Sequence, residues 1–166
     1  MEHTGLVIED DVRWMQRALL RAQEASDRGE VPVGAVVVRD GQILGEASNC
    51  PIQTHDPSMH AEIAAIREAC AAVANYRLPG ATLYVTLEPC TACFGVLMHA
   101  RIARVVFAAR EPRAGVLGSQ LALQTASFYN HKIEVTEGIC ADQSRQLLQA
   151  FFRARRERLG PLSVPE

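Results

Sequence analysis

His60-Ala61-Glu62 and Pro89-Cys90-Thr91-Ala92-Cys93 are the two stretches that decide how this chain must fold. Together they offer one imidazole and two thiols, and three protein ligands are the number that a catalytic zinc uses when its fourth position holds water. The glutamate in the first stretch supplies a carboxylate that can move protons beside such an ion. A fold that serves this chemistry must bring the two stretches together.

The spacing of these residues predicts how they meet. Cys90 and Cys93 are three positions apart, so in the first turn of a helix they share a face and can bind one ion. His60 and Glu62 would diverge inside a helix, because positions two apart differ by about 200° around its axis. They can converge where the chain enters a helix, and 56–58 (Asp-Pro-Ser) offers possible N-cap residues there. We therefore predict two helix N-termini directed at one zinc, with Glu62 as the catalytic acid and base.

Two other interpretations of the pattern stay open. A CxxC pair is often a structural zinc knuckle or a redox pair, and a fourth protein ligand would close the site to water. Cys50, in the loop before His60, is the candidate for that fourth ligand. We expect Cys50 to lie outside the metal shell.

Composition indicates one domain of ordinary globular type. The chain has 166 residues, of which 48% are hydrophobic and 22% charged, and we expect a single domain over 1–166 with its core at about 10–159. No apolar run is long enough to cross a membrane, and the acidic start is no signal peptide, so we expect a cytoplasmic protein. The net charge of −2 argues against non-specific nucleic-acid binding but not against a local basic patch.

Hydrophobic periodicity and turn signals predict the order of the elements. The expected helices span 10–28, 61–74, 90–99 and 142–159, and the expected strands span 31–38, 42–47, 82–87, 104–108 and 132–136. Asp40-Gly41 is a strong hairpin signal between the first two strands. The segments 48–58 and 110–119 read as loops. This order predicts a three-layer α/β domain on a mixed five-stranded sheet.

Two helices carry further expectations. In the last helix, Leu147, Leu148, Phe151 and Phe152 are expected to face the core. Apolar side chains nearly encircle the helix at 90–99, which indicates burial on more than one side, either within one domain or against a second copy of the chain.

From residue 10 to about 158 the chain closely resembles the bacterial tRNA-specific adenosine deaminases, which belong to the cytidine-deaminase-like superfamily. The stretches that carry the resemblance are EVPVGAVVV, HDPSMHAEIAAIREA, NYRLPGATLYVTLEPCTAC, RIARVVF, GS, YNH and FFRARR. The patterns H-x-E and P-C-x-x-C are shared by zinc nucleobase deaminases in general, whereas TLYVTLEPC and FFRARR favour the tRNA branch. The resemblance implies a three-layer α/β/α cytidine-deaminase-like fold, one zinc per chain and a homodimer.

The resemblance also implies the reaction and the roles of several residues. The expected reaction is the hydrolytic deamination of adenosine to inosine at the wobble position of a tRNA anticodon, with release of ammonia. His60, Cys90 and Cys93 would hold zinc, and Glu62 would shuttle protons. Asn49 would bind the flipped nucleoside, although a loop asparagine is often only a turn former.

Substrate positioning rests on further residues. By the same resemblance, Val33 and Leu87 would form an apolar wall beside the nucleoside, and Glu111 would lie near the RNA. Three residues depart from the family pattern, namely Ser48, Cys50 and Glu111. These departures concern the positioning of the substrate rather than the chemistry.

The end of the last helix holds the densest positive cluster of the chain, FFRARRER at 151–158. Arginines near a helix C-terminus complement the dipole in any case, so an ordinary solvated helix end is the alternative. Because an RNA loop brings phosphates, we expect Arg153, Arg155 and Arg156 to contact them, together with Arg110 and Arg113 of the preceding loop.

Two other functions compete with this hypothesis. A deaminase of free nucleosides or nucleobases, of the guanine or cytosine type, would keep the chemistry and change the substrate. A zinc-stabilised binding protein would catalyse nothing, and its metal content would not depend on Glu62.

Overall fold

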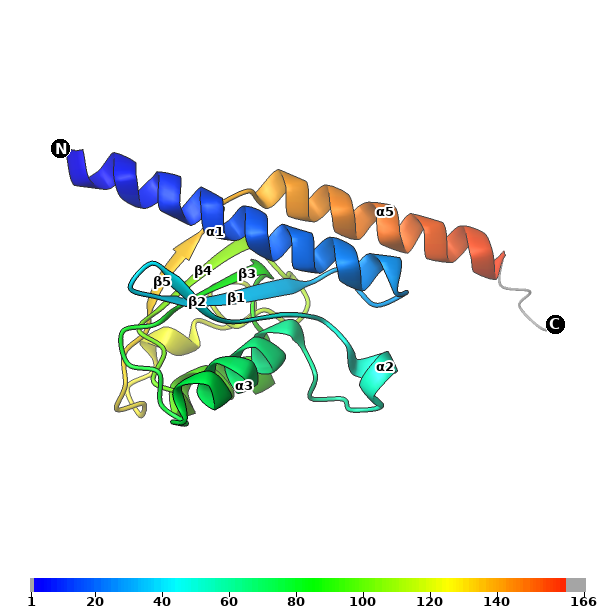
Figure 1. Ribbon diagram of the computed structural model, residues 1–166. Helices are drawn as coiled ribbons and strands as arrows, with labels where there is room; N and C mark the ends of the chain where they lie inside the picture. The colour runs from blue at the N-terminus through cyan, green and yellow to red at the C-terminus, as the bar shows by residue number, and fades with distance from the viewer. Residues whose placement is uncertain (1, 161–166) are drawn as a thin grey trace.

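A mixed sheet lies between two pairs of helices (Figure 1). The computed structural model describes the backbone of residues 2–160 and the side chains of residues 7–160. The helices are α1 (Glu2–Asp27), α2 (Pro51–Thr54), α3 (Ala61–Val73), α4 (Thr91–His99) and α5 (Ala141–Leu159), with a 3₁₀ turn η1 (Leu123–Thr125). The strands are β1 (Gly34–Arg39), β2 (Gln42–Ser48), β3 (Thr82–Leu87), β4 (Arg104–Ala109) and β5 (Glu134–Glu137).

The sheet has five strands in the order β2-β1-β3-β4-β5. β1 pairs antiparallel with β2 and with β3, whereas β3–β4 and β4–β5 are parallel. Asp40 and Gly41 join β1 to β2 with φ of 53° and 71°, the left-handed backbone of a tight hairpin turn. The predicted mixed five-stranded sheet is therefore confirmed, hairpin included.

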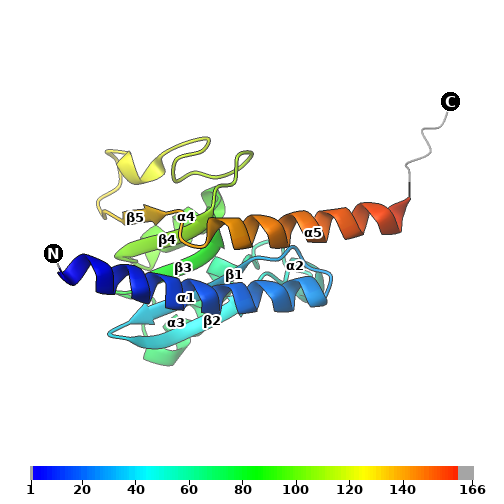
Figure 2. The ribbon, with the colours of Figure 1, turned by 90° about the horizontal axis from the view of Figure 1, so that it is seen from above.

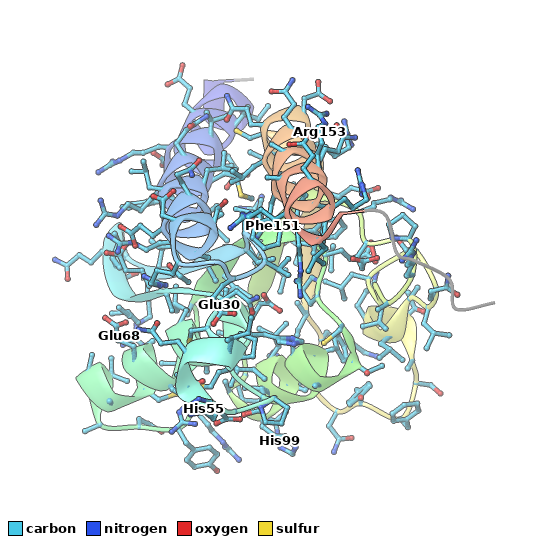
Figure 3. The ribbon with its side chains drawn as sticks, turned by 90° about the vertical axis from the view of Figure 1, so that its right-hand side faces the viewer. Glu30, His55, Glu68, His99, Phe151 and Arg153 are labelled. Atoms are coloured by element: carbon cyan, nitrogen blue, oxygen red, sulfur yellow. The ribbon has the colours of Figure 1, made fainter. Side chains whose placement is uncertain are left out.

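Alternation along the strands supplies one apolar face to each helical layer. Val36 and Val38 point to a cluster with Trp14 and Met15 of α1, whereas Ala35 and Val37 point to the larger core formed with α3 and α4. Figure 3 shows α1 and α5 end-on on one side of the sheet, with α3 and α4 on the other. Seen from above, α1 and α5 lie side by side across the sheet (Figure 2). The three-layer prediction is confirmed.

Two glycines let helices approach the sheet closely. A Cβ at Gly34 would lie 2.0 Å from the carbonyl oxygen of Ala18 in α1, and one at Gly45 would lie 2.4 Å from that of Ala65 in α3. Neither contact is possible for a larger residue without moving a helix. These glycines fix the distances of α1 and α3 from the antiparallel half of the sheet.

Several local predictions are wrong. α1 begins at Glu2 instead of residue 10, and the expected loop 48–58 contains the short helix α2. His60 itself is the N-cap of α3, while Asp56 accepts hydrogen bonds from the backbone N–H and the hydroxyl of Ser58. Phe152 is 40% exposed, so of the two phenylalanines only Phe151 faces the core.

The apolar helix α4 is covered largely by its own domain. Phe94 and Leu97 are fully buried and Met98 is 8% exposed, in the core shared with α3 and the sheet. The described part of the chain contains no helix that is both long and apolar enough to cross a bilayer.

Candidate active site

The starts of α3 and α4 bring the two quoted stretches together. His60 and Cys90 are the N-cap residues of these helices and have extended backbones, and neither side chain caps its own helix. A residue in this position projects its side chain off the helix end, because its φ and ψ are not yet helical. Cys93 lies in the first turn of α4 and is fully buried. The predicted pair of convergent helix N-termini is what the structure has.

The three side chains form a tight cluster. His60 Nδ1 lies 3.4 Å from Cys93 Sγ and 3.6 Å from Cys90 Sγ, and the two sulfur atoms are 3.8 Å apart. Among the described residues this is the one group of three or more histidine, cysteine, aspartate or glutamate side chains that could hold a metal ion. Cys50 is not part of it, so the structure contains no fourth protein ligand from that loop.

The pKa values of the three side chains in the cluster are shifted in different directions. Hydrogen bonds from the Cys93 thiol and the His60 ring lower the pKa of Cys90 to about 3. The hydrogen bond to Cys90, together with burial, raises the pKa of Cys93. The Cys90 sulfur also raises the pKa of His60 by hydrogen bonding. A thiolate is therefore already favoured here, and the thiolate is the form of cysteine that binds metal.

Glu62 stands beside this cluster in the first turn of α3. Its side chain is 4% exposed, and burial raises the pKa of its carboxyl, an effect that the Cys93 thiol and the His60 ring oppose. A buried carboxyl that can exist in both protonation states is suited to moving protons.

A cavity of about 310 Å³ opens next to the cluster. Its lining includes His60, Cys90 and Glu62, as well as four residues predicted to contact substrate, Val33, Asn49, Leu87 and Glu111. The Asn49 amide donates to the carbonyl oxygen of Val31 at 3.2 Å, which fixes its orientation at the wall. The cavity thus joins an apolar wall, a fixed amide and a buried carboxyl beside one candidate metal centre.

A profile of the MafB19-like deaminase family matches residues 9–156. The tRNA-specific adenosine deaminase of Haemophilus influenzae is 46% identical over 150 residues, which cover 90% of this chain and 87% of that protein. The chain belongs to the tRNA-specific adenosine deaminase family.

Solved structures of deaminases agree with this membership. One from studies of A-to-I editing by tRNA:A34 deaminases at the wobble position of transfer RNA superposes with a TM-score of 0.80 at 40% identity, covering 82% of this chain and 99% of that chain. A guanine deaminase from Bacillus subtilis is 39% identical with a TM-score of 0.57, but covers only 59% of this chain and 63% of that chain. The tRNA-related structure thus matches a much larger part of this family member.

A second hollow, of about 520 Å³, lies between the loop after β4 and α5. We call it the α5 groove; it is lined by Glu111, Arg113, Leu148, Gln149, Phe152, Arg153 and Arg156. Glu111 lines both the candidate active-site cavity and this groove, and its carboxylate accepts a hydrogen bond from the Arg113 backbone N–H at 2.9 Å. The groove and the cavity beside the His60, Cys90 and Cys93 cluster therefore share Glu111 as a common wall.

The structure divides the predicted arginine cluster. Arg153 and Arg156 line the α5 groove, whereas Arg155 borders another hollow with Gly29 and Phe151. In Figure 3, Phe151 lies between α1 and α5, and Arg153 lies on the side of α5 away from α1. Arg110 is ion-paired with Glu137 at 2.8 Å. The five arginines singled out in the sequence thus have at least three different surroundings.

Sequence reasoning missed part of the cavity wall. Val31, Pro51, Glu88 and Ala114 also line it, and Glu88 is 3% exposed. The signal for Glu88 was its place between the end of a buried strand and Pro89, where parallel strands direct residues toward a site. Ser48 and Cys50 flank Asn49 but do not line the cavity; the Ser48 hydroxyl donates to the carbonyl oxygen of Arg21 instead.

Proposed function

We propose that this protein deaminates adenosine to inosine at the wobble position of a tRNA anticodon, with water as the second reactant and ammonia as the second product. The observation that carries the proposal is the catalytic cavity, which Glu62 and Asn49 line together with His60 and Cys90 of the candidate metal cluster. The family membership of the chain supports adenosine in tRNA as the substrate. An anticodon loop offers its bases unpaired, so flipping one into a cavity costs little.

The geometry of the three donor atoms supports zinc as the metal. Tetrahedral zinc with ordinary Zn–S and Zn–N bonds of about 2.3 and 2.0–2.1 Å requires about 3.8 Å between two sulfurs and about 3.6 Å between sulfur and nitrogen. The corresponding distances here are 3.8 Å between the sulfurs and 3.4 and 3.6 Å between sulfur and His60 Nδ1. Three protein ligands leave the fourth position of the metal for water. Zinc held by these ligands would lower the pKa of that water toward about 7.

Glu62 would carry every proton of the reaction. It takes one from the attacking water and gives it to N1 of the adenine ring, while the water oxygen forms a bond to C6. Glu62 then accepts the remaining water proton and delivers it to the amino group, the C6–N6 bond breaks and ammonia leaves. Its burial beside the cluster supports this role, because bulk water cannot compete for these protons.

The α5 groove would bind the RNA that flanks the target adenosine. Arg113, Arg153 and Arg156 supply positive charge along it, and Phe152 supplies an exposed ring on which a base can stack. The exposure of Phe152 costs apolar burial within the domain, and contact with a nucleotide would recover it. Arg155, which the sequence grouped with these residues, is expected to contribute little.

A homodimer that works in the cytoplasm, where tRNA is modified, completes the proposal. Exposed aromatic side chains at the C-terminal end of α4 support a surface that a second copy of the chain covers. Tyr76 and Phe128 are 67% and 73% exposed there, around a hollow of about 350 Å³. Sedimentation at micromolar concentration should give twice the chain mass, and a monomer would contradict the dimer.

In the deciding experiment, the zinc-loaded protein is incubated separately with unmodified tRNA, with free adenosine and with free guanine. We expect inosine in the tRNA digest at the wobble position and no conversion of the free compounds. Conversion of guanine but not of tRNA would favour the free-base deaminase instead, which the 39% identity to a guanine deaminase keeps as the second candidate.

The α5 groove has its own test in a matched pair of double variants. Arg153→Gln with Arg156→Gln should weaken tRNA binding and flatten its log–log salt dependence by about 0.7 for each phosphate that is no longer neutralised. Arg155→Gln with Arg158→Gln removes the same charge outside the groove, and both residues border the Gly29 hollow. Equally weakened binding in the two double variants would mean that only overall charge matters, and the groove would have no special role.

A further inference from the structure

Glu88 is a buried carboxylate at the catalytic cavity that the deamination chemistry does not use. It lies between the end of β3 and Pro89, its side chain is 3% exposed, and it lines the cavity. It forms no ion pair with any Lys, Arg or His side chain among residues 7–160. A carboxylate is costly to bury without a partner, so its position calls for a specific contact.

That contact is with the loop after β4. Glu88 Oε1 accepts a hydrogen bond from the Ser119 hydroxyl at 2.7 Å. The other oxygen, Oε2, is buried without a hydrogen-bond partner, and a Cβ on Gly115 would lie 1.6 Å from it. Only a glycine at position 115 lets the loop backbone close over the carboxylate.

The same loop forms part of the cavity wall. Glu111 and Ala114 line the cavity, and the Gly115 N–H donates to the carbonyl oxygen of Glu111 at 2.9 Å. One residue further, the Val116 N–H donates to the carbonyl oxygen of Pro89 at 3.0 Å. The loop is thus fastened to the 88–89 segment at two points, a backbone bond and the carboxylate of Glu88.

We propose that Glu88 is a positioning residue, which holds the 111–119 loop against the catalytic cavity and thereby sets the wall that contacts the substrate RNA. This inference rests on the proposed function for its substrate. Glu88 acts through its contacts with Ser119 and Gly115, and it does not need to touch any reacting atom. Because Pro89 and Cys90 follow Glu88 directly, the hydrogen bonds that hold the loop also lie next to the start of α4.

Kinetics on a tRNA substrate test the proposal through the pattern of KM and kcat. Glu88→Leu should raise KM about tenfold, the value of one hydrogen bond to a charged group, and change kcat much less. Glu88→Gln keeps an oxygen that can accept from Ser119, so it should restore most of the affinity. Ser119→Ala should reproduce the KM effect of Glu88→Leu, and the double variant should be no worse than either single one.

A matched control and a second readout keep the test independent of the substrate. Thr125→Ala removes a hydroxyl that bonds only the carbonyl oxygen of Ala122 within the same connection, and it should leave KM unchanged. Hydrogen exchange at the amides of Gly115 and Val116 should become about tenfold faster in Glu88→Leu and Ser119→Ala. This measurement decides on the positioning role even if wild-type protein makes no inosine in tRNA, which would refute the proposed function alone.

Two results would overturn the inference. Unchanged exchange in the 111–119 loop of Glu88→Leu would mean that the carboxylate does not hold it. Loss of zinc in Glu88→Leu, without a change in Ser119→Ala, would mean that Glu88 acts through Cys90 rather than through the loop.

Discussion

Buried carboxylates on the two faces of the sheet have opposite surroundings. On the α1 face, Asp11 is 2% exposed and both of its oxygens are bonded. Arg104 donates to Oδ1 at 2.8 Å and to Oδ2 at 2.7 Å, and the Tyr84 hydroxyl donates to Oδ1 at 2.9 Å. Arg104 also donates to Thr136 of β5, so this network ties α1 to three strands.

At the catalytic cavity, Glu62 and Glu88 are as deeply buried but lack such a partner. Neither forms an ion pair with a Lys, Arg or His side chain in the part of the chain that the structure describes. Glu88 keeps one oxygen without a hydrogen bond, and burial raises the pKa of Glu62.

The presence or absence of an arginine partner suits a buried carboxylate to different roles. A guanidinium that bonds both oxygens fixes the position of a carboxylate and ties together the segments that carry the two side chains. A buried carboxylate without that partner costs folding free energy, and it can serve chemistry, as proposed for Glu62, or hold a loop, as proposed for Glu88. From this comparison we expect Asp11 to contribute to stability and Glu62 to catalysis, and each expectation can be tested.

The largest effect is expected for Glu62→Ala. Deamination should fall by about 10²–10⁴-fold or more, because general acid–base catalysis is lost. One zinc per chain should remain, since Glu62 is not expected to be a ligand, and the melting temperature should not fall, because the removed carboxyl is costly to bury and has no arginine partner. Metal analysis, inosine formation and thermal unfolding of the same preparation check all three.

Cys90→Ala is the matched comparison for Glu62→Ala. It should lose zinc together with activity, and lower solubility is expected because metal binding also stabilises the fold. If Glu62→Ala loses zinc as well, the division between ligands and proton carrier is wrong.

Asp11→Ala should have the next largest effect, on stability instead of activity. Removing one partner of a buried ion pair strands the Arg104 charge, and the free energy of unfolding should fall by about 3–5 kcal/mol. Denaturant unfolding measures this, and Tyr84→Phe, which removes a single hydrogen bond to Asp11, should cost only about 1 kcal/mol. Zinc content of the folded Asp11→Ala protein should be unchanged; its loss would remove the contrast between the two faces.

Glu46 sharpens the comparison because it is paired but less buried. Arg17 donates to both of its oxygens at 2.7 Å, and these hydrogen bonds lower the pKa of Glu46. A lowered folded-state pKa contributes stability above the unfolded pKa of about 4.3, and that stability is lost as the pH falls through the folded value. Glu46→Gln should therefore cost less than about 1 kcal/mol at pH 7.

The pH dependence provides the check on Glu46. The difference in unfolding free energy between wild type and Glu46→Gln should shrink as the pH is lowered below about 4. A difference that stays constant down to pH 3 would mean that the ion pair contributes nothing and that poorer packing explains the variant.

The smallest effect is expected for Cys50→Ser. Cys50 lies outside the three-residue cluster, and its backbone carbonyl and N–H are bonded to Thr54 and Met59. Zinc affinity and stability should remain within error of wild type in a metal-competition titration. A clear drop in zinc affinity would restore the closed, structural interpretation of the site.

The sequence by itself determined the elements and the reactive groups. Strand alternation, the Asp40-Gly41 turn and the two quoted stretches are local signals, because strand period, turn backbone and helix entry depend on neighbours in the chain. For that reason the sheet, its hairpin and the convergence of two helix starts followed from the residues alone. The limits of the helices were less certain, as the early start of α1 and the added α2 demonstrate.

Tertiary structure decided how those groups are partnered. The rotation of α5 about its axis is set by packing against α1 and the sheet, and it exposes Phe152 and turns Arg153 and Arg156, but not Arg155, toward the groove. Glu88 meets Ser119, and Asp11 meets Arg104, only after distant segments pack together. A carboxylate has the same sequence signature whether or not an arginine bonds it, so only the fold shows which carboxylates have such a partner and which do not.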